Sequence, residues 1–310
     1  MSGISTNRSN ITLPADISSE IIAKTQEASA VMQLARQIAL PGRGLSIPVI
    51  TSDPEANWVA ETGKKPISNP GLSTKTMTPY KLAVIVPFSD EFRRDAAALY
   101  DALVERLPAA LALKFDKTVF SGAAPGSGFD VLTGCTAQSI DKDASGNGGF
   151  YSALVGADTD IASHGYDVNG FAFAPQGRGE MLSALDKDGR PIFVNNVAEG
   201  ATPRLLGQPV VYTKGLYKAG NAASGSSGAS GYVPAAPDLL GVAGDWTQAL
   251  YGTVEGVKID ISDEATLPIG TSGAMENLWQ HNMFAVKAEI EVGFVAATDA
   301  FNRIVRTHSA

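Results

Sequence analysis

The feature that most constrains the fold is a run of apolar residues at helical spacing between positions 89 and 121. Ser89 is a suitable N-cap, and Asp90 and Glu91 would place negative charge in the first turn, where the helix dipole favours it. A helix over this range would be about 48 Å long. No single small domain can cover such a helix, so the pattern predicts a spine for several segments. Its apolar stripe comprises Phe92, Leu99, Leu103, Leu107, Leu111, Phe115 and Val119.

Prolines distinguish two parts of this region. Pro108 lies inside the predicted helix and should kink or interrupt it, because proline lacks a backbone donor. The preceding residues 51–79 contain four prolines and several strand-like stretches. This pattern predicts a long hairpin with a polar tip, entered by a strand at 45–50 and left by an apolar strand at 80–88.

The N-terminal residues have no core of their own. Residues 1 to about 15 are polar and rich in turn formers, which predicts an extended arm. From Asp16 onward, apolar residues recur at helical intervals, with Asp16 or Ser18 available as the cap. The helical positions are Ile17, Ile21, Ile22, Ala28, Val31, Met32 and Ala35.

Beyond Gly122, a suitable helix end, the chain turns to mixed α/β patterns. Strands are predicted at 168–174, 191–194 and 205–213, with a helix at 176–185 and a turn at 188–189. Residues 219–231 are of low complexity and predict a loop that tolerates shortening. The last part is predicted to be mainly β, with strands at 256–262, 285–295 and 301–305.

Composition excludes several classes of function. The formal net charge of -8, with scattered Lys and Arg, argues against a binder of bare nucleic acid. Cys135 is the single cysteine, so the chain can form neither an internal disulfide nor a cysteine-based zinc site, which fits a reducing cytoplasm. No stretch resembles a signal peptide or a membrane span. Only 18% of residues are charged, which suggests a surface that is buried against partners.

Enzyme-like motifs are incomplete. Residues 171–179 (FAFAPQGRG) could lead a strand into a helix that binds phosphate, but the third glycine of the dinucleotide motif is missing. A plain strand-to-helix turn is therefore favoured. Residues 141–152 begin like a calcium loop, yet Ser152 stands where a bidentate Glu is needed. Among the three histidines, His164, His281 and His308, we see no metal-binding spacing. We therefore expect no catalytic residue, no cofactor and no metal.

The order of the predicted elements is recognisable. An arm, a short helix, a long proline-rich hairpin, a spine helix, a mixed α/β region and a return to β structure follow one another. This order resembles the tailed-bacteriophage major capsid family, which has the α+β Hong Kong 97-type capsid fold. The similarity extends from about residue 13 to 305. The order of the motifs along the chain is more specific than any single motif. Its main motifs are Leu13–Asp16, Trp58–Glu61, Ser89–Phe92, Leu206–Val210 and Gly244–Trp246.

The resemblance implies a division into an arm, an extended E-loop, a peripheral domain with the spine helix, and an axial domain. The arm would be residues 1–27 and the E-loop 48–80. The peripheral domain would combine 28–47, 81–122 and 244–299, with the spine helix at 89–121. The axial domain would combine 123–243 and 300–310.

The resemblance also implies a function by assembly and not by catalysis. Copies of the chain would form hexamers and pentamers that close into an icosahedral shell around DNA, in the virion capsid, after assembly in the host cytoplasm. A separate scaffold protein, a portal and decoration proteins are expected partners, and no membrane is involved. The expected contacts with neighbouring subunits come from Trp58, Val59, Glu61, Lys64 and Lys65 of the E-loop and from Ile11, Leu13 and Ile17 of the arm.

Two alternatives remain open. An encapsulin-like bacterial nanocompartment resembles the same fold but encloses cargo enzymes, and the polar arm favours the phage over that alternative. An α/β nucleotide-binding enzyme would use Gly177 and Gly179. The tryptophans Trp58, Trp246 and Trp279 suit packing better than ligand stacking, and for Trp58 we expect poor burial within its own subunit and cover by a neighbour.

Overall fold

The computed structural model describes residues 29–52, 57–59, 64–65, 67, 71–89, 96–141, 149–185, 190, 204–224, 234–255, 257–269 and 274–308. Several predictions fall outside these residues. They concern the arm with Ile11, Leu13 and Ile17, and also Glu61, the strand at 191–194 and most of the calcium-like loop. Within the described residues, no helix is long and apolar enough to cross a membrane.

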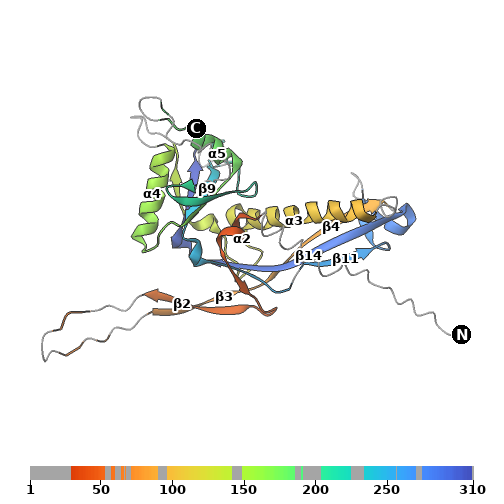
Figure 1. The fold of residues 1–310 in the computed structure, drawn as a ribbon, viewed down its shortest axis with the longest axis horizontal. Coiled ribbons are helices and arrows are strands. Elements are labelled where there is room, and N and C mark those ends of the chain that lie inside the picture. Colours follow the sequence, from red (N-terminus) through yellow and green to blue (C-terminus); the bar gives the residue numbers. More distant parts are fainter. Residues whose placement is uncertain are drawn as a thin grey trace.

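A long helix and a long strand define one half of the molecule (Figure 1). The strand β14 (Met283–Ala296) is the centre of a five-stranded sheet and pairs antiparallel with β4 (Tyr80–Ser89) over ten residue pairs. The helix α3 (Ala96–Ser121) lies along this sheet. The other members of the sheet are β1 (Arg36–Ala39), β10 (Ala249–Thr253) and β11 (Lys258–Ser262).

The alternation of side chains along β4 explains why α3 packs here. The residues at even positions, from Leu82 to Phe88, are partly buried and pack against the core beneath α3, whereas Ile85 and its odd-numbered neighbours are exposed. This two-residue period is that of a strand with one covered face. Leu107 and Leu111 of α3 complete the cluster on the covered side.

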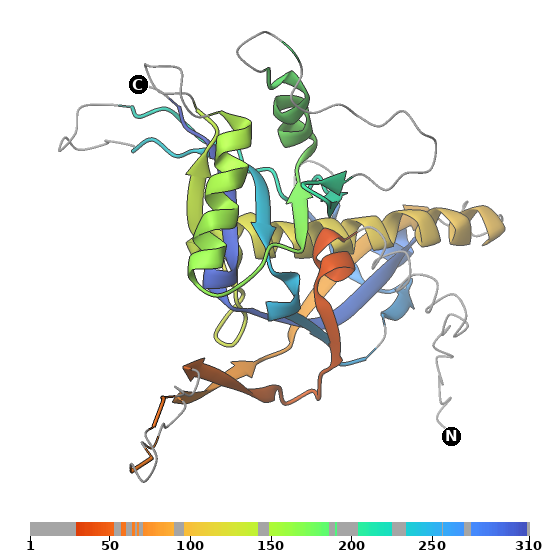
Figure 2. The same cartoon turned by 60° about the vertical axis from the view of Figure 1, so that its left-hand side comes forward.

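The other half of the molecule is a six-stranded sheet with the order β5-β15-β9-β6-β8-β7. The helix α4 (Phe150–Ser163) packs on this sheet, and α5 (Pro175–Ser183) follows β6 (Figures 1 and 2). The strands are β5 (Thr136–Ser139), β15 (Phe301–Arg306), β9 (Asp238–Gly244), β6 (Gly170–Phe173), β8 (Gln208–Tyr212) and β7 (Arg204–Leu205).

An aromatic core joins the two halves. The Trp246 ring packs edge-on against Phe120 and Phe301, with ring centroids 6.2 Å and 5.1 Å away. Its Nε1 donates a hydrogen bond to the carbonyl oxygen of Gly170 at 3.1 Å. Phe120 lies in the last turn of α3 and Phe301 begins β15, so this cluster, called here the joint, fixes the spine helix to the six-stranded sheet.

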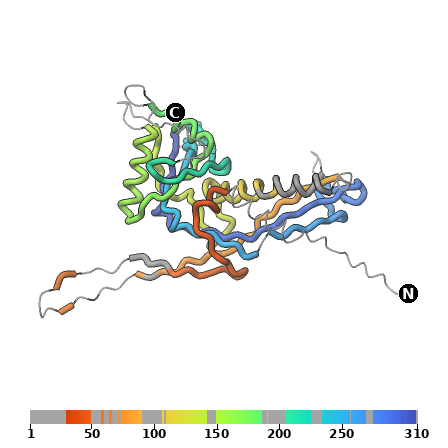
Figure 3. The backbone as a smooth tube through the Cα atoms, in the orientation of Figure 1, coloured from red at the N-terminus to blue at the C-terminus, as the bar shows by residue number. Residues whose placement is uncertain are grey.

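A hairpin leaves this body (Figures 1 and 3). It consists of β2 (Leu45–Ser52) and β3 (Gly71–Met77), which pair only with each other among the described strands. Smaller elements complete the fold. They are α2 (Ala30–Leu34), β12 (Thr266–Ile269), β13 (Ala274–Asn277) and short 3-10 turns.

The α+β class and most of the predicted strands are confirmed, with three corrections. The helix α3 runs continuously past position 108, so Pro108 does not interrupt it. Ala35, expected to be helical, is the extended residue that follows α2 and precedes strand β1. The single strand predicted at 205–213 is two strands, because Leu206 and Gly207 adopt positive φ angles of 51° and 83° and form a turn.

Candidate functional site

The β2–β3 hairpin carries most of the described residues that the sequence singled out for partner contacts. Trp58 has a relative exposure of 105% and Val59 one of 39%. Lys64 and Lys65 are exposed as well. The expectation that Trp58 and Val59 are poorly covered by their own chain is therefore confirmed. Trp58 thus does not anchor the core of its own subunit.

The base of the hairpin is fixed to the body by a buried methionine. Met77 is fully buried beside Leu40 and Val295. It fits because Gly252 and Gly293 face each other on β10 and β14, and a Cβ on Gly293 would lie only 2.8 Å from the Met77 Cγ. Because neither glycine has a side chain, Met77 at the hairpin base can pack directly against the two strands.

An ion pair adds a second attachment at the base. The Lys75 Nζ lies 2.6 Å from Asp130 Oδ2 and donates to the carbonyl oxygen of Ala296 at 2.6 Å. Asp130 Oδ2 also accepts a hydrogen bond from the Ala296 backbone N–H at 3.0 Å. These contacts link β3, the loop after α3 and the end of β14, so the hairpin leaves the body in a defined direction.

A buried carboxylate on α3 holds Ser29 and the first residues of α2. Asp116 of α3 accepts hydrogen bonds from Ser29 Oγ at 2.6 Å, from Thr213 Oγ1 at 2.7 Å and from the backbone N–H groups of Ala30 and Val31. Burial raises the pKa of Asp116, and these four donors counteract that effect in part. Ser29 and the start of α2 are therefore fixed directly on the spine helix.

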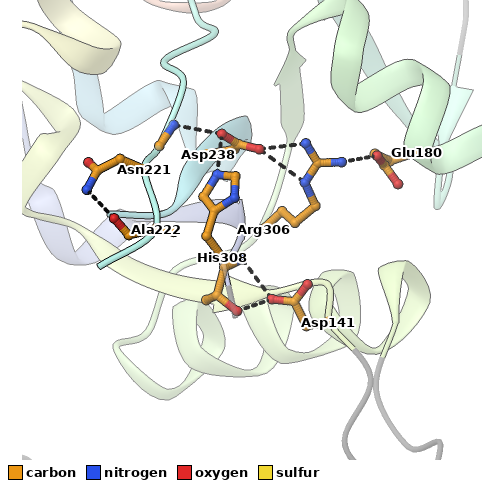
Figure 4. Close-up of polar contacts among 9 residues, drawn as sticks. Asp141, Glu180, Asn221, Ala222, Asp238, Arg306 and His308 are labelled. Carbon is orange, nitrogen blue, oxygen red and sulfur yellow. Dashed lines mark hydrogen bonds and ion pairs between the residues drawn. The ribbon is translucent and has the colours of Figure 1, made fainter. Parts of the chain in front are cut away.

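A polar cluster holds the other end of the chain (Figure 4). Asp238 accepts hydrogen bonds from Arg306 at 2.6 and 3.1 Å, from the Gly220 N–H at 2.7 Å, and contacts His308 Nε2 at 3.0 Å. Arg306 reaches Glu180 on α5 at 2.5 Å. Burial alone would raise the pKa of Asp238, but its hydrogen bonds and charged partners outweigh burial and lower that pKa to about 2.

The enzyme-like features take structural roles in this fold. Gly177 lies in the first turn of α5, where a Cβ would come within 2.5 Å of the Leu240 carbonyl oxygen. Its lack of a side chain therefore permits close helix–strand packing. Cys135 is buried, and burial raises the pKa of its thiol to about 12. Among the described residues, no group of three or more His, Cys, Asp or Glu side chains could hold a metal ion.

The three tryptophans occupy different environments. Trp246 is buried in the joint, as expected of a packing anchor. Trp279 is 72% exposed, so this ring does not anchor the core of its own subunit. It lies in a 3-10 turn that Asn277 caps by accepting a hydrogen bond from the Trp279 N–H at 3.0 Å, and nearby Met275 is also exposed. Exposure of these two apolar side chains was not predicted from the sequence, in which the polar residues around Trp279 are the only signal of it.

Comparisons with known proteins give one consistent result. The model of the phage capsid family matches residues 9–302. The probable major capsid protein gp17 of Mycobacterium phage L5 is 28% identical over 284 residues, which cover 89% of this chain and 83% of that protein. The major capsid protein of Staphylococcus phage 80alpha is 23% identical over 299 residues, which cover 95% and 85%.

Solved structures agree on the fold. A chain from Mycobacterium phage Bobi superposes with a TM-score of 0.69 at 19% identity and covers 91% of each chain. The capsid of an empty GTA particle has a TM-score of 0.65 at 16% identity, with 91% of this chain and 90% of that chain covered. The arrangement of hairpin, spine helix and two sheets is therefore shared with phage capsid chains.

Proposed function

The chain belongs to the phage capsid family, and from this premise we propose that it is the major capsid protein of a tailed bacteriophage. Many copies assemble through hexamers and pentamers into an icosahedral shell that encloses the DNA genome. The observation that carries this proposal is the β2–β3 hairpin, whose base is fixed to the body while Trp58 beyond it has no cover. The family and the curated relatives, all phage capsid proteins, favour a phage shell over an encapsulin-like nanocompartment and over a nucleotide-binding enzyme.

We assign the two halves of the body to a peripheral and an axial domain. The peripheral domain takes 28–47, 81–122 and 244–299, the segments that supply α3 and the five-stranded sheet. The axial domain takes 123–243 and 300–310, and β15 supports this because it pairs with β5 and β9 of the six-stranded sheet. The E-loop is 48–80 and the arm is 1–27.

Shell formation requires that each subunit contact several neighbours, so elements that extend beyond their own core are suited to it. We assign this role to Trp58, Val59, Glu61, Lys64 and Lys65 on the E-loop, and to Ile11, Leu13 and Ile17 on the arm. The lysines would face acidic groups of the adjacent subunit, and Trp58 would supply an aromatic anchor. The net charge of -8 suits a container for DNA, because a basic wall would hold the DNA that must be packed and released.

The proposal includes partners and location. A separate scaffold protein, a portal and decoration proteins are expected to join the same shell, which assembles in the bacterial cytoplasm and becomes the virion capsid. Contact with DNA would not depend on base sequence, and the net charge of -8 argues against tight binding of the nucleic acid.

Truncation of the hairpin tests the proposal. Residues 53–70 are replaced by a short turn, which retains β2, β3 and the contacts of Met77 and Lys75. The variant should fold with near-native circular dichroism and melting temperature but form no shells in negative-stain micrographs. Shortening the loop at 225–230 is the matched control, and it should leave both folding and assembly intact. A parent chain that sediments only as a 32.2 kDa monomer at every salt concentration and pH would contradict the proposed function.

A further inference from the structure

The helix α4 has an exposed face opposite the one that packs on the six-stranded sheet. Its packed face lies over the β5 end of the sheet, where a Cβ on Gly156 would come within 3.1 Å of Gln138 Oε1. Four exposed residues at spacings of four, three and four lie on the opposite face, and we call them the α4 face. They are Tyr151, Val155, Asp158 and Ala162. Val155 keeps a relative exposure of 42%, so the α4 face combines an apolar side chain with a carboxylate.

The turn between β7 and β8 lies at the other end of the same sheet. The strand order begins with β5 and ends with β7, so about 24 Å separate the two edge strands at the usual strand spacing. Figure 2 shows α4 and this turn on opposite sides of the sheet. Arg204 is exposed and Leu206 has a relative exposure of 50%, and we call these two residues the β7 edge. The β7 edge thus combines an apolar side chain with a cation.

The backbone of Leu206 does not suit its own turn. Leu206 and Gly207 have φ angles of 51° and 83°, and a two-residue hairpin turn with positive φ at both positions favours Asn-Gly. A leucine in this left-handed conformation is strained, and half of its side chain also faces water. A residue that conflicts with its local structure is expected where it serves a partner. Leu206 is therefore suited to being covered by another molecule.

The α4 face and the β7 edge have opposite charge. The stretch 149–169, which contains α4, has three Asp and no Lys or Arg, whereas 204–218 has three Lys or Arg and no Asp or Glu. Among the residues that the structure describes, neither Asp158 nor Arg204 has an oppositely charged partner within 4 Å. Two surfaces with apolar centres and opposite charges are complementary to each other.

The position of the two surfaces determines how they can meet. They lie at opposite edges of one sheet, so they cannot touch within a single chain. A contact between the α4 face of one copy and the β7 edge of the next is heterologous, and its repetition closes a ring or continues as a filament. Closed rings of subunits are the hexamers and pentamers of the proposed function.

We propose that the α4 face of one subunit packs against the β7 edge of the next subunit around each hexamer and pentamer. Val155 then covers Leu206, and Asp158 pairs with Arg204. This inference rests on the proposed shell function and adds the partner of two surfaces that lie away from the β2–β3 hairpin. It also gives each ring a direction, because every subunit uses a different surface toward each of its two neighbours.

Disulfide cross-linking tests the contact directly. Val155→Cys and Leu206→Cys are combined in one chain, which is assembled into shells, oxidised and run on a denaturing gel without reductant. A bond within one chain is excluded, because the two positions lie far beyond the Cα separation of about 7 Å that a disulfide permits. We expect a ladder that ends at six chains. Native Cys135 should not react, because it is buried and its thiol pKa is raised to about 12.

Two controls accompany the cross-linking. Each single cysteine variant should give no cross-link, because a heterologous contact does not bring two identical surfaces together. Leu206→Cys combined with Ile85→Cys should give no ladder either, although Ile85 on the five-stranded sheet is 48% exposed, similar to Val155.

Exchange of the two charges provides a second measurement. Asp158→Arg or Arg204→Asp alone places like charges together and should raise the protein concentration needed for assembly roughly tenfold. The double exchange should restore assembly toward that of the parent. Asp158→Arg combined with Arg43→Asp has the same net charge and should not be restored. Because all three positions are exposed, the variants should stay folded, which circular dichroism verifies.

Leu206→Asn separates a role in assembly from a role in folding. Asparagine suits the turn better than leucine does, so the melting temperature of the monomer should equal or exceed that of the parent. Loss of the apolar contact should nevertheless weaken shell assembly, as judged by sedimentation. A lower melting temperature together with normal assembly would assign Leu206 to the fold of its own subunit and overturn the proposal.

The remaining outcomes separate this contact from the proposed function. Shells of the double cysteine variant without a covalent ladder would overturn the contact and leave the shell function standing. Dimers of Val155→Cys alone would show that two α4 faces pack against each other, and a ladder beyond six chains would show an open filament in place of a closed ring. A parent chain that never assembles would contradict the shell function, and the contact would fail with it.

Discussion

The joint and the β2–β3 hairpin place a tryptophan in opposite environments. Trp246 in the joint is 2% exposed, packs against two phenylalanines and donates its indole hydrogen to Gly170. Trp58 on the hairpin is fully exposed. An aromatic ring gains free energy only where water is excluded from its surface. The joint therefore stabilises the single subunit. Trp58 on the hairpin can contribute free energy only when a partner covers it.

The polar cluster around Asp238 at the C-terminal end stabilises the single subunit, as the joint does. Arg306 and His308 are held on Asp238 (Figure 4), so the chain end contributes to the single subunit. The base of the hairpin also belongs there, through Met77 and Lys75. The boundary between the two regions thus lies inside the hairpin, beyond its last contact with the sheet.

Loss of the Trp246 ring should have the largest effect on the free energy of unfolding. Trp246→Ala removes a buried ring from the joint and leaves the Gly170 carbonyl without its donor, so we expect the free energy of unfolding to fall by about 3–5 kcal/mol. Urea denaturation of the monomer, followed by circular dichroism, measures it. Trp279→Ala is the control, because that ring is exposed, and it should cost less than about 0.5 kcal/mol. Equal effects of the two substitutions would show that the buried ring of the joint stabilises the subunit no more than an exposed ring does.

Truncation of Met77 at the hairpin base should have the next largest effect on the free energy of unfolding. Met77→Ala leaves a cavity beside Leu40 and Val295, and we expect a loss of about 2–3 kcal/mol. The same denaturation experiment measures it, with exposed Met275→Ala as the matched control. If both methionine variants melt like the parent, the base is not part of the folded core and the boundary inside the hairpin is misplaced.

Acid should weaken the C-terminal cluster. The folded-state pKa of Asp238 is about 2, below its usual value near 4, so the folded state binds this proton less readily than the unfolded chain does. The carboxylate then contributes about 2 kcal/mol of stability above pH 4, and this contribution is lost as the pH falls from about 4 to 2.

The Asp238→Asn variant should lack this pH-dependent contribution. Its free energy of unfolding should lie closer to that of the parent at pH 2 than at pH 7. Asp158→Asn, at an exposed position of α4, is the control and should retain the parent's profile. A constant difference between Asp238→Asn and the parent across this range would show that the cluster acts by packing alone.

The sequence predicted the spine and the strand before it because each has a sustained apolar pattern, and it predicted the long hairpin from prolines between strand-like stretches. Along β4, one covered face produces strict alternation, which is visible without tertiary information. The expected interruption at Pro108 is wrong. Proline costs a helix one hydrogen bond, but packing of Leu107 and Leu111 on the sheet offsets that loss. Local chemistry alone could not reveal that support.

The features that the sequence missed depend on distant partners. Ala153, Leu154, Ala157 and Ile161 form the buried face of α4, but the surrounding Gly, Ser and Asp residues hid the helical period. The Asp116 site joins this residue of α3 to Ser29 and Thr213, which lie 87 and 97 positions away from it in the sequence. A single carboxylate within a helical stripe gives no sign of such contacts. Exposure of Trp58 was foreseen because the prolines around it argued against a packed domain.

The smallest effect on folding should come from Trp58→Ala, with the largest effect on assembly. No buried surface is lost from the subunit, so the free energy of unfolding of the monomer should change by less than about 0.5 kcal/mol. Removal of an aromatic anchor from an interface typically costs 2 kcal/mol or more per contact, and a shell repeats that cost at every subunit. Shells should therefore be absent or need a much higher protein concentration, as judged by sedimentation and negative-stain microscopy. Trp58→Phe, which keeps an aromatic ring, should restore part of the assembly. A Trp58→Ala monomer that melts far below the parent would place this ring in its own subunit's core and erase the distinction from Trp246.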